Sequence, residues 1–317
     1  MTRPKYSVSD LRSIHDLSLP DLIFRAQVVH REHHKANEVQ LCSLLSVKTG
    51  GCPEDCSYCP QSSHYSTGVE RQKMMSVGDA VQAATRAQNA GATRFCMGSA
   101  GRNAPTGESF DDILAMVRAV RGLGMEACIT LGMLNDDQAT RLAEAGLTVY
   151  NHNVDTSREF YGSIISTRTY DDRLATLARV RKAGMKVCSG GIIGMGESID
   201  DRCGMLVTLA NLDPHPESVP INALVAVKGT PLQDQPPVDP LELVRMIATA
   251  RIVMPKTQVR LSAGRSALSR EAQVMCFLAG ANSIFYGEKL LVTGNPELDA
   301  DQKLLRDAGM RAAAPIH

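Results

Sequence analysis

The sequence has no tryptophan, and aromatic residues make up only 4% of its 317 residues. Aliphatic side chains must therefore fill most of the hydrophobic core. The chain also has no excess of one charge, because 34 basic and 34 acidic side chains cancel and no run of five like charges occurs. A nucleic-acid-binding protein needs a cluster of basic residues, so the expected partners are small molecules and proteins.

Long apolar segments are missing as well. No segment approaches the 18 uninterrupted apolar residues of a membrane-spanning helix, and the residues from Met1 to Ser7 contain no apolar stretch typical of a signal peptide. A cytoplasmic location is therefore expected. Because cysteines stay reduced in that compartment, the nine cysteines of the chain indicate metal or cluster ligation rather than disulfides.

Three of these cysteines, Cys52, Cys56 and Cys59, lie within eight residues in the segment G-C-P-E-D-C-S-Y-C-P. The surrounding glycines and prolines disfavour regular structure and predict a loop. Iron–sulfur clusters are held by cysteine thiolates, and in a four-iron cluster three local ligands leave one iron open to another molecule. An open iron indicates chemistry rather than simple electron transfer.

Zinc is the main alternative for this loop. The three thiolates and His64 would form a Cys3His site, since sulfur and imidazole both suit zinc. Zinc ligands, however, usually come as two separated pairs of residues. A disulfide is a weaker alternative, because three cysteines cannot all pair among themselves. An iron–sulfur cluster is the favoured hypothesis.

From Leu41 onward, short apolar or β-branched segments alternate with amphipathic segments that begin at Ser, Asp or Asn and often end at Gly. Strands are predicted near residues 43–49, 93–99, 126–132, 148–155, 186–193, 218–225, 258–263 and 283–287. Helices are predicted near residues 76–90, 109–122, 136–145, 170–183, 198–211, 240–253, 270–280 and 299–309. Eight alternating units predict the α/β fold class, as a TIM-type (β/α)8 barrel rather than an open sheet.

Three parts of the chain are expected. Residues 1–40, with a helical pattern over residues 8–35, should form an N-terminal helical extension that packs on the barrel. Residues 41–296 should form the barrel itself, and residues 297–317 a C-terminal helix and tail.

Four predicted strands carry residues that suit a site inside the barrel: Cys96, Cys128, Cys188 and Arg260. A single strand cysteine is most often a small core residue. Three cysteines at similar depth shift the balance toward ligands of a second cluster. The arginine alone would more naturally pair with a buried carboxylate, because a guanidinium is almost always protonated and is a poor ligand.

The predicted fourth strand, Y-N-H-N-V-D-T-S, has a period of two that places Asn151, Asn153 and Asp155 on one face. Asn222, on the sixth strand, adds an amide at the same depth. Buried amides need partners, and a urea-like ligand supplies matching donors and acceptors. The alternative is an ordinary strand-end turn, in which Asn and Asp are common.

The glycine-rich segment from Gly190 to Glu197 lacks the third glycine and the spacing of a dinucleotide fingerprint, so a Rossmann site is not expected. Its glycines allow either a tight turn or a close approach of the backbone to a flat ring. Arg173, on the helix after the polar strand, either pairs with a ligand carboxylate or lies on a solvated helix face.

The spacing Cys-x3-Cys-x2-Cys after the first strand of a barrel resembles the signature of the radical S-adenosylmethionine enzymes, in which the open iron binds the amino and carboxylate groups of the cofactor. Over roughly residues 18–296 the chain is similar to the biotin synthase family within that superfamily. The blocks that carry this similarity are G-C-P-E-D-C-S-Y-C-P-Q-S, F-C-M-G, E-A-C-I-T-L-G, Y-N-H-N-V-D-T-S, K-V-C-S-G-G-I-I-G-M-G-E, V-P-I-N, V-K-G-T-P-L, V-R-L-S-A-G-R and A-N-S-I-F-Y-G. Residues 100–110 and those after 297 lie outside these blocks.

The resemblance implies residue roles. The ligands of a four-iron (4Fe-4S) cluster would be Cys52, Cys56 and Cys59, and those of an auxiliary two-iron (2Fe-2S) cluster would be Cys96, Cys128, Cys188 and Arg260. The residues that border S-adenosylmethionine would be Tyr58, Gly98, Ala100, Asp155, Arg173 and Ile192. Asn153 and Asn222 would face the ureido ring of the substrate, and no residue is assigned a catalytic acid or base role. Cys42, Cys203 and Cys276 match no ligand role and are predicted to be structural.

The same resemblance implies the activity: radical insertion of sulfur into dethiobiotin, the last step of biotin biosynthesis. The implied partners are reduced flavodoxin or ferredoxin as electron donor, iron–sulfur assembly proteins, and a second copy of the chain in a homodimer. The alternatives are another radical S-adenosylmethionine barrel, such as a mutase, a maturase or a lipoyl-type sulfur inserter, and an electron-transfer protein. The three strand cysteines favour sulfur insertion, since a mutase has no need of them.

Overall fold

The computed structural model describes residues 5–287, 291–295 and 297–314. The strands are β1 (Glu38–Lys48), β2 (Arg94–Ser99), β3 (Glu126–Thr130), β4 (Val149–Asn151), β5 (Lys186–Cys188), β6 (Gly191–Ile193), β7 (Ser218–Ala223), β8 (Gln258–Leu261), β9 (Ser283–Phe285) and β10 (Arg311–Ala312). The helices are α1 (Val8–His15), α2 (Leu19–His33), α3 (Val77–Asn89), α4 (Glu108–Gly122), α5 (Asp136–Glu144), α6 (Arg158–Tyr161), α7 (Tyr170–Lys182), α8 (Ile199–Ala210), α9 (Pro240–Val253), α10 (Arg270–Leu278) and α11 (Leu298–Asp307), with a 3₁₀ turn at Arg265–Ala267.

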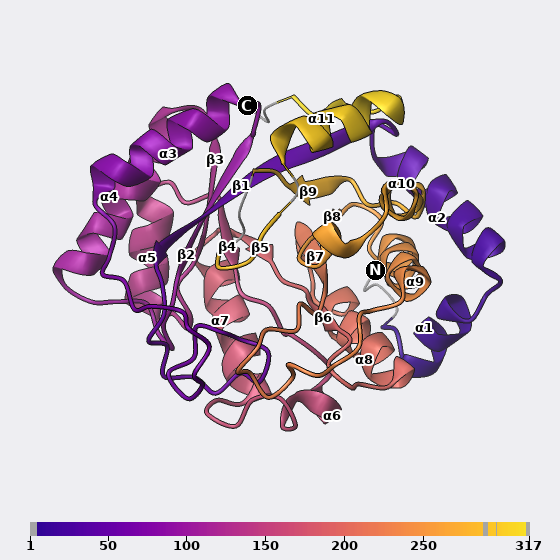
Figure 1. The fold of residues 1–317 in the computed structure, drawn as a ribbon, viewed down its shortest axis with the longest axis horizontal. Helices are drawn as coiled ribbons and strands as arrows, with labels where there is room; N and C mark the ends of the chain where they lie inside the picture. Colours follow the sequence, from indigo (N-terminus) through magenta and orange to yellow (C-terminus); the bar gives the residue numbers. More distant parts are fainter. Residues whose placement is uncertain (1–4, 288–290, 296, 315–317) are drawn as a thin grey trace.

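The strands form a closed parallel barrel. Neighbours follow the order β1-β2-β3-β4-β5-β7-β8-β9, and β9 pairs with β1 to close the ring. The short strand β6 continues β5 and pairs with β7. Figure 1 shows the strands at the centre of the molecule with helices around them. The predicted (β/α)8 barrel is confirmed.

Helix ends follow the expected local chemistry. The helices α1, α5, α7 and α8 each begin with a capping box, in which the N-cap side chain and the third helical residue bond each other's backbone N–H groups. At the ends of α4 and α7, Gly124 and Gly184 have φ angles of 78° and 80°, which a residue with a side chain rarely adopts.

The N-terminal residues fold as two helices instead of one continuous pattern. Ser18 caps the start of α2, where its side chain accepts a hydrogen bond from Asp21 N, and Pro20 lies in the first turn of this helix. Helix α1 packs on α8 and α9, while α2 packs on α9 and α10. The tail returns to the barrel, where β10 pairs with Glu38 and Val39. The division into extension, barrel and tail stays a prediction, and its residues 1–4, 288–290, 296 and 315–317 lie outside the described residues.

The fourth and fifth predicted strands differ most from expectation, and those predicted near residues 126–132, 218–225, 258–263 and 283–287 end about two residues early. The fourth ends at Asn151 rather than near residue 155, because Asp155 has a left-handed φ of 69°. The fifth divides into β5 and β6 at Gly190, whose carbonyl accepts hydrogen bonds from Val154 N and Asp155 N. A Cβ atom at Gly190 would lie 1.9 Å from Pro220 O, so only glycine fits there. Helix α6 was not predicted.

The amino end of the barrel interior is polar. The Glu126 carboxylate accepts hydrogen bonds from Gln40 Nε2 and Arg94 Nε, both at 3.0 Å. All three side chains are almost fully buried. Since Arg94 pairs in register with Glu126, and Cys96 with Cys128 two residues later, the cysteines face the interior directly above this layer. None of the described helices is long and apolar enough to cross a membrane.

Candidate functional site

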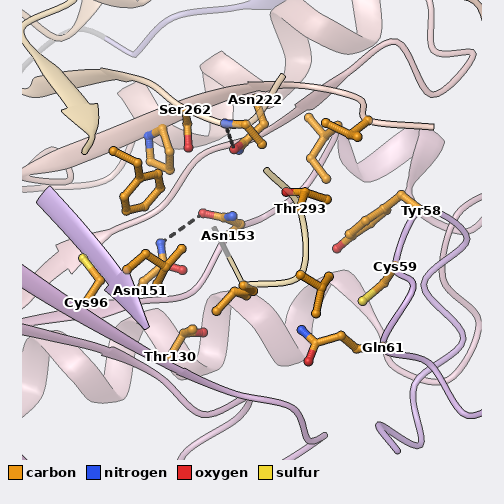
Figure 2. Close-up of a pocket in the computed structure, with 18 of the residues that line it drawn as sticks. Tyr58, Cys59, Gln61, Cys96, Thr130, Asn151, Asn153, Asn222, Ser262 and Thr293 are labelled. Carbon is orange, nitrogen blue, oxygen red and sulfur yellow. Dashed lines mark hydrogen bonds between the residues drawn. The ribbon is translucent and has the colours of Figure 1, made fainter. Parts of the chain in front are cut away.

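A cavity of about 250 Å³ opens among the strand ends and the loops that follow them. Figure 2 shows Asn153 near its centre, with Tyr58, Cys59 and Gln61 on one side and Cys96 and Asn151 on the other. Side chains from the loop after β1 and from the interior of β2 therefore meet across one space. This is the end of the barrel at which (β/α)8 enzymes place their active sites.

The three clustered cysteines lie in the loop after β1. Its backbone is fixed by hydrogen bonds from Cys59 N to Cys56 O (2.9 Å) and from Cys52 N to Gln61 O (3.0 Å). All three cysteines are free of disulfides. Burial raises the pKa of the Cys56 thiol to about 11 and that of Cys59 to about 12, so each needs a bound cation to remain a thiolate. An iron cluster supplies that charge.

Arg168 lies against this loop. Its Nη2 is 3.7 Å from Cys56 Sγ, and its Nε is 3.5 Å from Glu54 Oε2. The side chains of Arg168 and Glu54 are 8% and 2% exposed, so the pair is shielded from water. A guanidinium thus donates toward one thiol of the predicted cluster, a role that the sequence analysis did not assign.

Asp155 forms a buried polar centre at the side of the cavity. Its Oδ2 accepts a hydrogen bond from Tyr58 OH at 2.7 Å and forms an ion pair with Arg173 Nη2. Burial raises the pKa of Tyr58 well above its usual value, so the phenol stays protonated and donates. Arg173 also bonds Asn153 O at 2.8 Å. The alternative of Arg173 on a solvated helix face is therefore wrong.

The three asparagines line the cavity, as predicted. Asn153 Oδ1 accepts from Asn151 Nδ2 (3.3 Å) and from Gly190 N (3.1 Å). Asn222 donates to Gly191 O and accepts from Ala263 N. Within the described part of the chain, Asn153 Nδ2 has no protein acceptor, so it is available to a carbonyl oxygen of a ligand.

A second group of thiols lies deeper in the barrel. Cys96, Cys128 and Cys188 are at most 4% exposed and pack together around Val149. The Cys128 thiol donates a hydrogen bond to Cys96, which lowers the pKa of Cys96 to about 7. Arg260, 1% exposed, directs Nη1 toward Cys188 Sγ at 3.9 Å. These donors suit a two-iron cluster with three thiolates and one nitrogen.

The zinc alternative gains no support. Among the described residues, no three His, Cys, Asp or Glu side chains converge closely enough to hold a single metal ion. His64 Nε2 lies 3.1 Å from Pro53 O instead. Cysteine thiolates are the ordinary ligands of iron–sulfur clusters, so an iron–sulfur cluster stays the favoured hypothesis for both thiol groups.

Comparison with known proteins places this site in a family. The model of the radical S-adenosylmethionine superfamily matches residues 46–209, and that of the Biotin and Thiamin Synthesis associated domain matches residues 220–311. The biotin synthase of Methylobacterium nodulans is 66% identical over 309 residues, which cover 97% of this chain and 93% of that protein. The chain belongs to the biotin synthase family. The biotin synthase of Myxococcus xanthus is 63% identical over 99% of this chain and 90% of its own length.

A solved structure agrees with the fold. Methylornithine synthase superposes with a TM-score of 0.80 at 19% identity, over 98% of this chain and 95% of its own length. Its agreement supports the barrel alone. Membership of the radical S-adenosylmethionine superfamily implies S-adenosylmethionine and a four-iron cluster as cofactors of the biotin synthase family.

The structure brings most of the predicted site residues of this family member to one cavity. Those that line it are Tyr58, Cys59, Cys96, Cys128, Asn153, Asp155, Ile192, Asn222 and Arg260. The residues that line the cavity do not include the other predicted site residues, which are Cys52, Cys56, Gly98, Ala100, Arg173 and Cys188. Thr130, Ser262 and Thr293 also line it but were not predicted, because isolated hydroxyl residues carry no signal in a single sequence.

Replacing Arg168 with Met should lower the reduction potential of the four-iron cluster by roughly 40 mV. Loss of the guanidinium removes a hydrogen bond that strengthens by about 1 kcal/mol when the cluster gains an electron. A redox titration followed by electron paramagnetic resonance measures the shift. Arg168→Lys keeps the charge and should shift the potential less. An unchanged or higher potential in Arg168→Met would contradict this role.

Proposed function

We propose that this member of the biotin synthase family forms biotin from dethiobiotin by inserting sulfur, and that its two thiol groups hold the two clusters that this reaction needs. The observation that carries the proposal is a single cavity bordered by both groups: Cys59 at one side and Cys96, Cys128 and Arg260 at the other. A substrate in that cavity would lie between them.

The cofactors supply the difficult chemistry: S-adenosylmethionine at the four-iron cluster provides a 5′-deoxyadenosyl radical, and the two-iron cluster provides the sulfur. The protein binds and orients the cofactor and the substrate, and it excludes water from them. In our proposal Cys52, Cys56 and Cys59 hold the first cluster. The second would be held by Cys96, Cys128, Cys188 and Arg260.

Asp155 and its partners would position S-adenosylmethionine. Asp155 is 2% exposed and lines the cavity, and Tyr58 OH and Arg173 both contact its Oδ2 and hold the carboxylate in a fixed direction. A fixed carboxylate suits the two hydroxyls of a ribose. Ile192, which lines the cavity, offers an apolar surface to an adenine ring, and Gly98 and Ala100 would border the cofactor through their backbone.

Asn153 and Asn222 would bind the ureido ring of dethiobiotin. Asn153 Oδ1 and both the amide nitrogen and the amide oxygen of Asn222 bond backbone groups, so the two side chains cannot rotate freely. Such preorganisation lowers the entropy lost on binding. The apolar lining of the cavity, including Leu44 and Phe285, suits the hydrocarbon part of the substrate and excludes water from a radical.

Partners and location follow from the same proposal. We propose reduced flavodoxin or ferredoxin as electron donor and iron–sulfur assembly proteins as the source of both clusters. We also propose a cytoplasmic homodimer, which light scattering at working concentration tests directly.

The test is a Mössbauer spectrum of protein reconstituted with iron-57 without oxygen. We expect separate four-iron and two-iron components, because three cysteines of the loop leave one iron of a four-iron cluster open, whereas three strand cysteines and Arg260 supply the four ligands of a two-iron cluster. A four-iron signal alone would contradict the second site and return the strand cysteines to the core. A protein with zinc and no cluster would overturn the whole proposal.

A further inference from the structure

Cys42 lies among the deep thiols, although the sequence predicted only a structural role for it. It is fully buried on β1 and packs with Cys96, Cys128 and Cys188. On β1 the side chains alternate, so Cys42 shares the interior face with Leu44, which lines the cavity. In register, Leu44 lies beside Cys96 and Cys42 lies one step below.

The Arg260 guanidinium is held between two sulfur atoms. Its Nη2 is 3.2 Å from Cys42 Sγ, and its Nη1 is 3.9 Å from Cys188 Sγ. Nε donates to Ser283 Oγ at 3.0 Å, and the guanidinium carbon lies 4.8 Å from the centre of the Phe285 ring. Cys42 therefore contacts the very group that is proposed as the fourth ligand.

We propose that Cys42 is an alternative fourth ligand of the auxiliary two-iron cluster and can replace Arg260 there. This inference rests on the proposed function. A guanidinium is a poor ligand because it is almost always protonated, whereas a thiolate is the ordinary ligand of iron–sulfur clusters. With Cys42 the interior offers four thiols, which is the full donor set of a two-iron cluster.

Two other roles for Cys42 predict different results. As a core residue, it would only fill space, and cluster content would not depend on it. As a hydrogen-bond acceptor, it would orient Arg260 and lose all influence once Arg260 is removed. Only a ligand role predicts that loss of Cys42 lowers the cluster content more strongly when the guanidinium is absent. Comparison of the double variant with Arg260→Ala therefore distinguishes the three roles.

The experiment compares wild type, Arg260→Ala, Cys42→Ser and the double variant, each reconstituted with iron-57 without oxygen. Mössbauer spectra count the two-iron component, with the four-iron component as an internal standard for folding. We expect Arg260→Ala to keep the two-iron component and to lose the nitrogen-14 coupling of its reduced form. The double variant should hold roughly tenfold less two-iron cluster than Arg260→Ala, because loss of a ligand costs at least as much as loss of an outer partner.

The control is Arg260→Ala combined with Cys276→Ser, since Cys276 is a buried cysteine on α10, outside the deep thiol group. It should match Arg260→Ala alone. Equal two-iron content in the double variant and in Arg260→Ala would overturn the proposal, as would complete loss in Arg260→Ala. Absence of a two-iron component in wild type would instead contradict the proposed function. If the variants with Arg260→Ala fail to fold, Arg260→Met is used instead, because methionine fills the space of the arginine side chain. The two-iron content of Arg260→Met with and without Cys42→Ala then gives the same comparison.

Discussion

Replacing Cys128 with Ala is expected to reduce biotin formation to background while some 5′-deoxyadenosine is still formed. Cys128 is 1% exposed, lines the cavity and packs with Cys96, so its loss would remove a proposed ligand of the auxiliary cluster without changing the loop after β1. The truncation itself should cost only about 1 kcal/mol of folding free energy, as small deletions in a core do. Product analysis after a single anaerobic incubation measures both compounds.

Cys276→Ala is the matched control for this change. Cys276 is equally buried, yet it lies on α10 and borders no part of the cavity that the described residues form. Biotin formation should remain near the wild-type level. Retained biotin formation in Cys128→Ala would remove this residue from the sulfur-donating site.

Replacing Arg173 with Met should destabilise the protein by about 3–5 kcal/mol and weaken S-adenosylmethionine binding at least about tenfold. The Arg173 and Asp155 side chains are 4% and 3% exposed, so methionine would leave a buried carboxylate without its cation. Asp155 would also lose the contact that fixes its direction in the cavity. Urea denaturation of the cluster-free protein and calorimetric titration of the reconstituted protein measure the two effects.

Arg158→Met supplies the comparison. Arg158 and Asp171 form an ion pair of similar chemistry nearby, but their side chains are 50% and 73% exposed. Water screens such a pair, so both the unfolding free energy and cofactor binding should change little. Equal effects of the two substitutions would show that burial of the Asp155 pair is not what stabilises this part of the site.

The barrel and most of the site were predictable because their signals are local. Capping residues, helix-ending glycines and a period of two determine elements within a few neighbours, and Asn151, Asn153 and Asp155, which the period of two placed on one face, all line the cavity. The backbone did not follow the expected strand to residue 155, however. The left-handed turn at Asp155 depends on the approach of Gly190 and Gly191 from another strand, which no local pattern reveals.

Contacts between distant segments account for the rest. Arg168 reaches Cys56 across 112 positions of sequence, and Arg260 reaches Cys42 across 218. The two partners of each contact lie far apart in the sequence, so a single sequence gives no reason to connect them. The same reason applies to Thr293 and Ser262, because a hydroxyl residue can be recognised as part of a site only when the cavity that it lines is known.

A polar layer of Gln40, Arg94 and Glu126 lies at the amino end of the barrel interior, opposite the end at which the cavity lies. Gln40, Arg94 and Glu126 are buried, and the first two donate hydrogen bonds to the third, so bonded polar side chains lie below the deep thiols. Whatever occupies the deepest position has to arrive first and leave last. If Cys128 holds the two-iron cluster as we propose, its iron would have to be delivered before cofactor and substrate fill the space above it, and its replacement would have to wait until both have departed.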